Sequence, residues 1–258
     1  MAVNNYLKTY ASLVKGLSEK TVGVFNRRFG INQAKRETLE SIGQFMGITR
    51  ERVRQIEKAG FIYIKANKKE ILEKIFAEFT EYFKNNGGLK REDLVLEELG
   101  GKAGQSYVLF LLNLGNEFSK VFEKKDFHSF WTTEKDGEQS TPKTLVSLIS
   151  DIKKYNGPVD KNEFLTGISP KYSLQPKAVL AFVEISKNIK ENKEGKIGLT
   201  EWPEINPRGI RDKSFLVFKK EQKPLHFTDV AKLIDSHNYN LPNKKTLPQT
   251  VHNELIKD

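Results

Sequence analysis

The stretch that decides the fold of the N-terminal part is Thr38–Glu57, which reads Thr-Leu-Glu-Ser-Ile-Gly-Gln-Phe-Met-Gly-Ile-Thr-Arg-Glu-Arg-Val-Arg-Gln-Ile-Glu. Apolar residues recur with helical spacing on both sides of Gly47, at Leu39, Ile42, Met46, Val53 and Ile56. Gly47 can take the positive φ that ends a helix, and Thr49 can cap the next helix. Gly43 lets the two helices cross closely, and Ile48 packs into the corner. The pattern predicts a helix-turn-helix.

The second predicted helix has a polar face that can read DNA. Arg50, Glu51, Arg54 and Gln55 point away from the apolar positions, and their guanidinium, carboxylate and amide groups can read base edges in a major groove. The alternative is that these charges form an ordinary solvated helix face. Because the glycine, cap and core positions agree with one another, the sequence favours DNA binding.

Charge and composition support a polyanionic partner. The chain has 258 residues, a formal charge of +10 and 38% hydrophobic residues, which predicts one to three small domains in a soluble globular protein. Residues 1–65 hold twelve Lys/Arg against five Asp/Glu, an excess of +7. A field of this sign attracts nucleic acid. An acidic membrane surface is the alternative, but no basic amphipathic terminus supports it.

The composition also bears on the cellular compartment. With no cysteine, the chain has neither disulfides nor thiolate metal sites, and secretion gains no support. The N-terminus lacks the apolar core of a signal peptide, and the longest apolar run, Tyr107 to Leu112, is too short to span a bilayer. We therefore expect a cytoplasmic protein without a membrane partner.

Two further helices are predicted before this stretch, within residues 3–16 and from Ser18 to Gly30. The start Leu17-Ser18-Glu19-Lys20, the end Arg27-Arg28-Phe29-Gly30-Ile31 and Thr38–Glu57 together resemble region 4 of the sigma-70 family of bacterial transcription initiation factors. The resemblance covers about residues 10–66. In that family the module binds the upstream promoter element through its second helix and touches RNA polymerase.

The resemblance implies two groups of DNA-contacting residues: base-facing Arg50, Glu51, Arg54 and Gln55, and phosphate-neighbouring Thr49, Arg52 and Lys58. The sequence has nothing like the aromatic-rich sigma region that melts promoter DNA. We therefore interpret residues 1–66 as the DNA reader of a regulator rather than as part of a stand-alone initiation factor.

The apolar stripe from Phe61 to Phe83 predicts one long, lysine-rich helix, with residues 67–87 as a linker that ends at Gly87-Gly88. The favoured interpretation is a linker helix that packs on its own neighbours. The alternative is a seam for a homodimer or another partner.

Residues 88–205 contain a weak internal repeat, predicted to be two winged-helix-like domains over 88–136 and 137–205. The expected helices are Lys90–Leu99, Gln105–Leu114, Pro142–Tyr155, Asp160–Leu165 and Gln175–Ile185. The expected hairpins pair Ser119–Glu123 with Phe127–Thr132, and Ile185–Lys190 with Lys196–Trp202. Because the helix before each hairpin is largely apolar, scaffolding or protein contact is favoured over DNA binding.

The C-terminal part, residues 206–258, resembles the HARE-type helix-turn-helix of chromatin and restriction proteins, a fold shared by the delta subunit of bacterial RNA polymerase. The resemblance rests on Phe215-Leu216-Val217, Pro224-Leu225-His226-Phe227-Thr228-Asp229-Val230-Ala231-Lys232-Leu233-Ile234 and Thr246-Leu247-Pro248-Gln249-Thr250-Val251-His252-Asn253-Glu254-Leu255. That family finishes with a β-hairpin wing, so a truncated, incomplete module is expected here. A capped helix from Thr246 would turn six residues toward DNA, with protein docking as the alternative: Lys244, Lys245, Thr246, Gln249, His252 and Asn253.

No pattern of catalytic or cofactor-binding residues is present. The four histidines lack ligand spacing, and Gly100-Gly101-Lys102-Ala103-Gly104-Gln105-Ser106 lacks the spacing of a phosphate loop. The sequence therefore predicts neither an enzyme, a metal site nor a cofactor.

Together these patterns predict a mainly α fold, an array of helix-turn-helix and winged-helix-like domains with short β-hairpins. The predicted function is a sequence-specific regulator of transcription that binds double-stranded DNA. The alternative is an interaction protein that docks on RNA polymerase through its sigma-like and delta-like ends without reading DNA.

Overall fold

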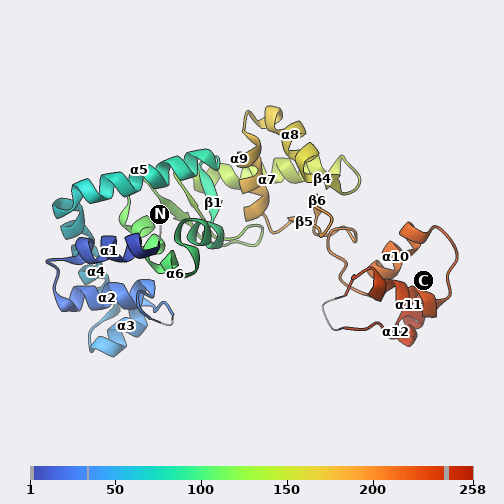
Figure 1. Ribbon diagram of the computed structural model, residues 1–258, viewed down its shortest axis with the longest axis horizontal. Helices are drawn as coiled ribbons and strands as arrows, with labels where there is room; N and C mark the ends of the chain where they lie inside the picture. Colours follow the sequence, from blue (N-terminus) through green and yellow to red (C-terminus); the bar gives the residue numbers. More distant parts are fainter. Residues whose placement is uncertain (1–2, 34, 241–243, 258) are drawn as a thin grey trace. The chain divides into compact units, whose positions relative to one another are not determined.

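The computed structural model describes residues 3–33, 35–240 and 244–257. Within these residues the chain forms twelve helices and two small antiparallel sheets, which confirms the predicted fold class (Figure 1). The chain divides into two compact units. Unit 1 comprises the described residues of Met1–Lys124, His128–Thr141 and Lys177–Ile185, and unit 2 those of Lys125–Phe127, Pro142–Pro176 and Ser186–Asp258.

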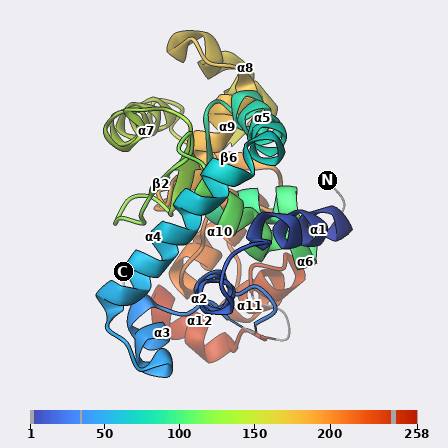
Figure 2. The same ribbon diagram turned by 90° about the vertical axis from the view of Figure 1, so that its left-hand side faces the viewer.

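Unit 1 begins with five helices: α1 (Val3–Val14), α2 (Glu19–Phe29), α3 (Leu39–Met46), α4 (Arg50–Asn67) and α5 (Lys69–Asn85). Helices α3 and α4 lie side by side in both views (Figures 1 and 2). The single long helix expected from Phe61 to Phe83 is wrong, because the chain breaks at Lys68, where φ is −128°. Neither glycine nor proline marks this break. The break lets α5 turn its buried residues, Leu72, Ile75, Phe79 and Phe83, into the core.

After α5 come β1 (Leu89–Arg91), α6 (Glu92–Leu114), β2 (Ser119–Val121) and β3 (Phe130–Thr132). The strands pair in the order β1-β3-β2, and α6 bends at Gly101, whose φ is 56°. The order helix, strand, helix, helix, hairpin is that of a winged helix. Its first helix is α5, so the segment interpreted as a linker forms part of this module. Strand β1 was not expected from the sequence.

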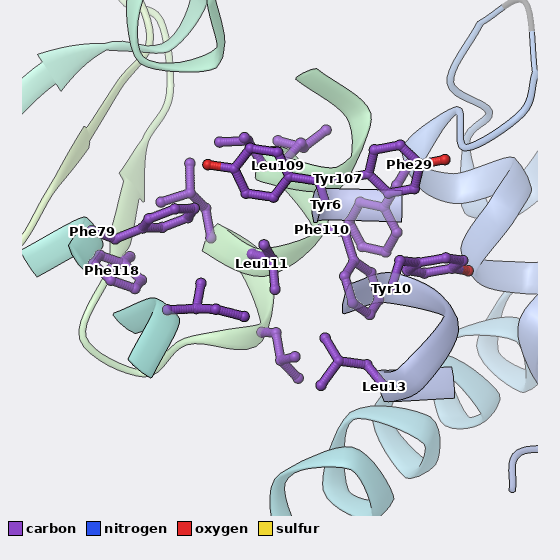
Figure 3. Packing of buried hydrophobic residues seen from close by; sticks show 14 of the residues in the cluster. Tyr6, Tyr10, Leu13, Phe29, Phe79, Tyr107, Leu109, Phe110, Leu111 and Phe118 are labelled. Carbon is purple, nitrogen blue, oxygen red and sulfur yellow. The ribbon is translucent and has the colours of Figure 1, made fainter. Parts of the chain in front are cut away.

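One hydrophobic core is shared by α1, α2, the C-terminal part of α4 and this winged helix, and it is separate from the small core between α3 and the start of α4. The second half of α6, from Tyr107 to Leu112, is buried throughout and packs against residues of α1 and α2. The Phe110 ring lies 5.1 Å from Tyr10 and 5.4 Å from Phe29, both edge-on (Figure 3). Because the third helix of this winged module is buried by protein, it cannot enter a DNA groove.

A buried ion-pair cluster joins β1, α6 and α9 (Pro176–Ile185), which belongs to unit 1. Lys90 is only 5% exposed, and its Nζ lies 2.9 Å from carboxylate oxygens of both Glu98 and Glu184. Burial alone would lower the pKa of Lys90, but its hydrogen bonds to the two carboxylates outweigh burial and raise that pKa. Lys90 therefore stays charged, and its two carboxylate partners offset the cost of burying a cation.

Unit 2 contains α7 (Gly137–Lys153) from Pro142 onward, followed by β4 (Val159–Asp160), α8 (Lys161–Tyr172), β5 (Ile189–Glu191) and β6 (Lys196–Leu199). Its strands pair in the order β4-β6-β5. With α9 counted in chain order, the elements repeat those from α5 to β3. The order of helices and strands thus recurs, and two winged-helix-like domains stay a prediction; β4, like β1, was not anticipated.

The C-terminal part of unit 2 is a three-helix cluster of α10 (Ile210–Glu221), α11 (Phe227–Ser236) and α12 (Pro248–Leu255). Its core contains Val217, Val230, Ala231, Ile234 and Val251. Thr246 does not cap the last helix as expected. Leu247 occupies the cap position, and no side chain makes a capping hydrogen bond there.

Asp151 joins α7 to α8 inside unit 2. Its carboxylate accepts hydrogen bonds from Lys154 at 2.7 Å, from Lys171 at 2.5 Å and from the Tyr172 hydroxyl at 2.9 Å. Burial alone would raise the pKa of Asp151, but these hydrogen bonds outweigh burial and lower the pKa from 3.8 to about 2. The lowered pKa means that the charged form stabilises the folded state.

We expect Asp151→Asn to lower the free energy of unfolding of unit 2 by about 1–2 kcal/mol at pH 7. The wild-type advantage should be complete above the unfolded-state pKa, near 4, and should disappear as the pH falls toward 2. Urea unfolding of both proteins at a series of pH values measures this difference. A difference that stays constant from pH 7 to pH 2 contradicts the assignment.

Candidate nucleic-acid interface

The helix-turn-helix is built by local capping contacts. The Thr38 hydroxyl accepts a hydrogen bond from the Ser41 backbone N–H at 3.1 Å, and the Thr49 hydroxyl accepts one from the Arg52 backbone N–H at 3.2 Å. Between the two helices, Gly47 has φ 64° and ψ 33°, the left-handed conformation. The predicted turn at Gly47 and the predicted cap at Thr49 are both confirmed.

Close approach at Gly43 holds the two helices together. A Cβ atom on Gly43 would lie 2.7 Å from the Ile48 carbonyl oxygen and 3.3 Å from the Arg50 backbone nitrogen. Val24 of α2, Ile42 of α3 and Val53 of α4 form a small, fully buried core. The absence of a side chain at Gly43 therefore lets the turn and the start of α4 pack directly on α3.

The N-terminal half of α4 exposes all four residues expected to face bases: Arg50, Glu51, Arg54 and Gln55. Arg54 donates two hydrogen bonds to Glu51, from Nε at 2.8 Å and from Nη2 at 2.6 Å. Gln55 also donates to Glu51, at 3.4 Å. The hydrogen bond from Arg54 lowers the pKa of Glu51, and the same bond raises the pKa of Arg54. The face is therefore a connected network of charged and amide groups.

The residues expected near phosphate lie beside this network. Arg52 Nη1 donates to Gln55 Oε1 at 3.2 Å, and Lys58 is exposed one turn further along α4. The Thr49 hydroxyl is used by the cap. A cavity of about 240 Å³ next to Arg52 is lined by residues at the start of α2 and on α4: Ser18, Lys20, Thr21, Arg52, Gln55, Ile56 and Ala59. Arg52 and Lys20 thus place two cations near the N-terminal end of α2.

The sequence did not indicate the side-chain contacts of Arg27 that link α2 to α3. The Arg27 guanidinium lies 3.3 Å from the centre of the exposed Phe45 ring and 2.6 Å from Glu37 Oε1, and Glu37 also accepts a hydrogen bond from the Ser41 hydroxyl. A cation on an aromatic face is stabilising. Arg27 is 10 positions from Glu37 and 18 from Phe45, so no local pattern indicated these contacts. Arg27 therefore links α2 to the segment before α3 and to α3 itself.

Of the six C-terminal candidates, five are wholly or partly exposed and one is buried. Lys244, Lys245, Gln249 and Asn253 are exposed, and His252 is half-buried. Thr246 is only 9% exposed, its hydroxyl accepts a hydrogen bond from Asn240 at 2.7 Å, and its backbone N–H donates to Asp235 at 3.0 Å. Thr246 therefore bonds to Asp235 and Asn240, and its side chain is not available to a groove.

Comparison with known proteins agrees with the geometry of the first module. Residues 13–66 match the family described as Sigma-70, region 4, a DNA-binding helix-turn-helix of sigma factors. The HARE-type resemblance of residues 206–258 stays a prediction.

Curated relatives match the same part of the chain. A 53-residue segment is 38% identical to the RNA polymerase principal sigma factor HrdD of Streptomyces viridifaciens, covering 20% of this chain and 16% of that protein. The RNA polymerase sigma factor sigB of Arabidopsis thaliana is 39% identical over 57 residues, 22% of this chain and 10% of the relative. The RNA polymerase sigma factor SigA of a Bacillus species is 46% identical over 41 residues, 16% of this chain and 11% of the relative. The chain thus spans a small fraction of the length of each relative.

The described residues contain neither a membrane-spanning helix nor a metal-binding cluster. No helix in this part of the protein is long and apolar enough to cross a bilayer. Among the same residues, no group of three or more His, Asp or Glu side chains could hold a metal ion.

Proposed function

We propose that this protein is a non-enzymatic, sequence-specific regulator of transcription that reads double-stranded DNA by placing the N-terminal half of α4 in a major groove. The observation that carries the proposal is the exposed face of Arg50, Glu51, Arg54 and Gln55, on which Arg54 and Gln55 donate to Glu51, in a segment that matches Sigma-70, region 4. The basic excess of residues 1–65 supplies the attraction to phosphate.

The chemistry of the network suits base edges. An arginine can donate two hydrogen bonds to guanine O6 and N7, glutamine can pair with adenine N6 and N7, and glutamate can accept from cytosine N4. Glu51 holds the Arg54 guanidinium with two hydrogen bonds, so the Arg54 side chain loses less conformational freedom when it meets a base. Arg52 and Lys20, near the start of α2, are positioned to contact phosphate and fix the register of α4.

The test is selection of preferred sequences from a random duplex library, followed by binding measurements with Arg54→Ala and Gln55→Ala. Each substitution should cost about 1–3 kcal/mol on the preferred duplex and little on a random duplex, because base contacts carry the preference. Fluorescence anisotropy titrations on both duplexes measure the two affinities. Lys69→Ala is the control, since Lys69 is an exposed cation of α5 outside the helix-turn-helix, and should retain the preference.

The proposal fails if no sequence is enriched, or if both substitutions leave specific and random binding unchanged. The second candidate is then an RNA polymerase-associated protein that does not read DNA, as the names of the matched relatives suggest. Its support would be co-purification with RNA polymerase from a nuclease-treated lysate. Homodimer formation and a cytoplasmic location stay predictions under either function.

A further inference from the structure

Unit 2 contains a second basic site, far in sequence from α4. A cavity of about 530 Å³ lies among the turn that joins β5 to β6, the link before α10, α10 itself and the residues that follow α11. Its lining includes five cationic side chains: Lys190, Lys193, Arg208, Lys213 and Lys244. All these lining residues belong to unit 2.

The carboxylates of this cavity are already neutralised by other lysines. Three line the cavity, and each has an ion-pair partner outside the lining: Glu191 with Lys161 at 2.8 Å, Glu194 with Lys196 at 3.5 Å and Glu204 with Lys219 at 2.6 Å. Within the described part of the chain, none of the five lining cations forms an ion pair with a carboxylate. The cavity therefore keeps a local excess of positive charge.

Three of the five cations donate hydrogen bonds to neutral oxygens. Lys193 donates to the Asn238 carbonyl at 2.9 Å, Lys213 to Asn240 Oδ1 at 2.7 Å and Arg208 to the Thr200 carbonyl at 3.3 Å. Such contacts orient an ammonium or guanidinium group without cancelling its charge. The structure thus fixes several cations around one concavity and leaves their charge for a ligand.

Lys213 is a cation held partly buried beside a second cation, Lys244. Its side chain is half-buried, and burial together with the positive charge of Lys244 holds the pKa of Lys213 below its usual range, although Asp235 acts in the opposite direction. An anion placed between Lys213 and Lys244 would offset the repulsion between them and favour the charged form of Lys213. The cavity therefore favours an anionic ligand.

We propose that this cavity binds the phosphate backbone of duplex DNA and gives the protein a second DNA contact, independent of the bases that α4 reads. The inference rests on the proposed function for its choice of polyanion. Four of the five cations, Lys190, Lys193, Arg208 and Lys244, are exposed, as suits side chains that reach a backbone. The amides of Asn206 and Asn238 and the Tyr239 hydroxyl in the same lining are further groups of the kind that contact phosphate and sugar.

The test is the salt dependence of binding to a duplex of random sequence, measured with the full chain. The variant is Lys190→Gln/Lys244→Gln. Within the described residues neither lysine side chain makes a hydrogen bond or ion pair, so the substitutions should leave the fold intact. We expect roughly tenfold weaker binding at low salt, and a log–log salt slope that is shallower by about 0.9 for each phosphate group that is no longer neutralised. The preference for a selected sequence over the random duplex should not change.

The matched control is Lys223→Gln/Lys232→Gln, which removes the same charge from two exposed lysines of unit 2 that lie outside the cavity and already have carboxylate partners, Glu221 and Asp229. The control should keep the wild-type salt slope. An equal effect of both double variants would overturn the proposal, because net charge alone would then explain the weaker binding.

The two proposals can fail separately. If α4 proves to read no sequence, the random-duplex slopes still decide whether the cavity binds DNA. If Lys190→Gln/Lys244→Gln binds the random duplex as wild type does, the cavity proposal is wrong, whatever α4 does. Inorganic tripolyphosphate that binds the wild type but not the variant, with duplex binding unchanged, would overturn it in favour of a small phosphate ligand.

Discussion

Replacing Phe110 by alanine is expected to lower the free energy of unfolding of unit 1 by about 3–5 kcal/mol, the usual cost of deleting a buried aromatic ring. Phe110 is 1% exposed and lies in α6, within the winged module. Its ring contacts four aromatic rings of the preceding helices edge-on or nearly so: Tyr10, Phe25, Phe29 and Phe61. The alanine would leave a cavity where the two modules meet.

Because this core is shared, Phe110→Ala should weaken DNA binding as well as stability, although Phe110 is remote in sequence from α4. Chemical unfolding followed by tryptophan fluorescence, in a Trp202→Phe background that leaves the buried Trp131, reports the winged module, and DNA binding reports the helix-turn-helix. Phe122→Ala is the matched control, since Phe122 is 72% exposed and its removal should cost about 0.5 kcal/mol or less. A Phe110→Ala protein with a destabilised winged module and undiminished DNA binding would show that the two modules fold independently.

Gly43→Val is expected to destabilise the helix-turn-helix by about 3 kcal/mol and to abolish preferred-sequence binding. Any Cβ at position 43 meets the Ile48 carbonyl oxygen at 2.7 Å, and that oxygen belongs to backbone that cannot rotate away. A branched side chain enlarges the clash and must push the turn and the start of α4 off α3. The small core of Val24, Ile42 and Val53 would then open.

Gly23→Ala in α2 is the control for this substitution. A Cβ at Gly23 meets only the Met46 methyl group, at 3.5 Å, which is ordinary contact. Because alanine favours a helix over glycine, this variant should be neutral or more stable by about 0.5–1 kcal/mol. Thermal melting and anisotropy titrations compare the variants. Wild-type binding by Gly43→Val would mean that the turn does not depend on close packing at this glycine.

The reader module was predictable because its signals are local. The glycine turn, the Thr49 cap and the spacing of Ile42 and Val53 all fall within the Thr38–Glu57 stretch, and each has one strong physical reason. The four base-facing candidates follow from the same helical period, so their exposure could be anticipated. For the hydrogen bonds of Glu51 with Arg54 and Gln55, the only signal in the sequence is the spacing of three and four residues, which brings side chains together on a helix.

Other features depended on contacts between distant residues. Strands β1 and β4 are three and two residues long, too short for a recognisable alternation, and exist because the paired strands β3 and β6 lie beside them. The residues after Thr246 suggested that it caps a helix. In the structure its backbone N–H instead donates to Asp235, and its hydroxyl accepts a hydrogen bond from Asn240. The Arg27–Phe45 contact likewise joins two helices.

The sequence by itself determined the helix-turn-helix from Thr38 to Glu57 and the basic character of the N-terminal part, because helix periods, caps and net charge are properties of neighbouring residues. Only the tertiary structure decided that the third helix of the first winged module is buried against the reader, and that, among the described residues, five lysine and arginine side chains around one cavity lack carboxylate partners. Burial and ion pairing depend on which distant residues meet, and a linear pattern does not carry that information.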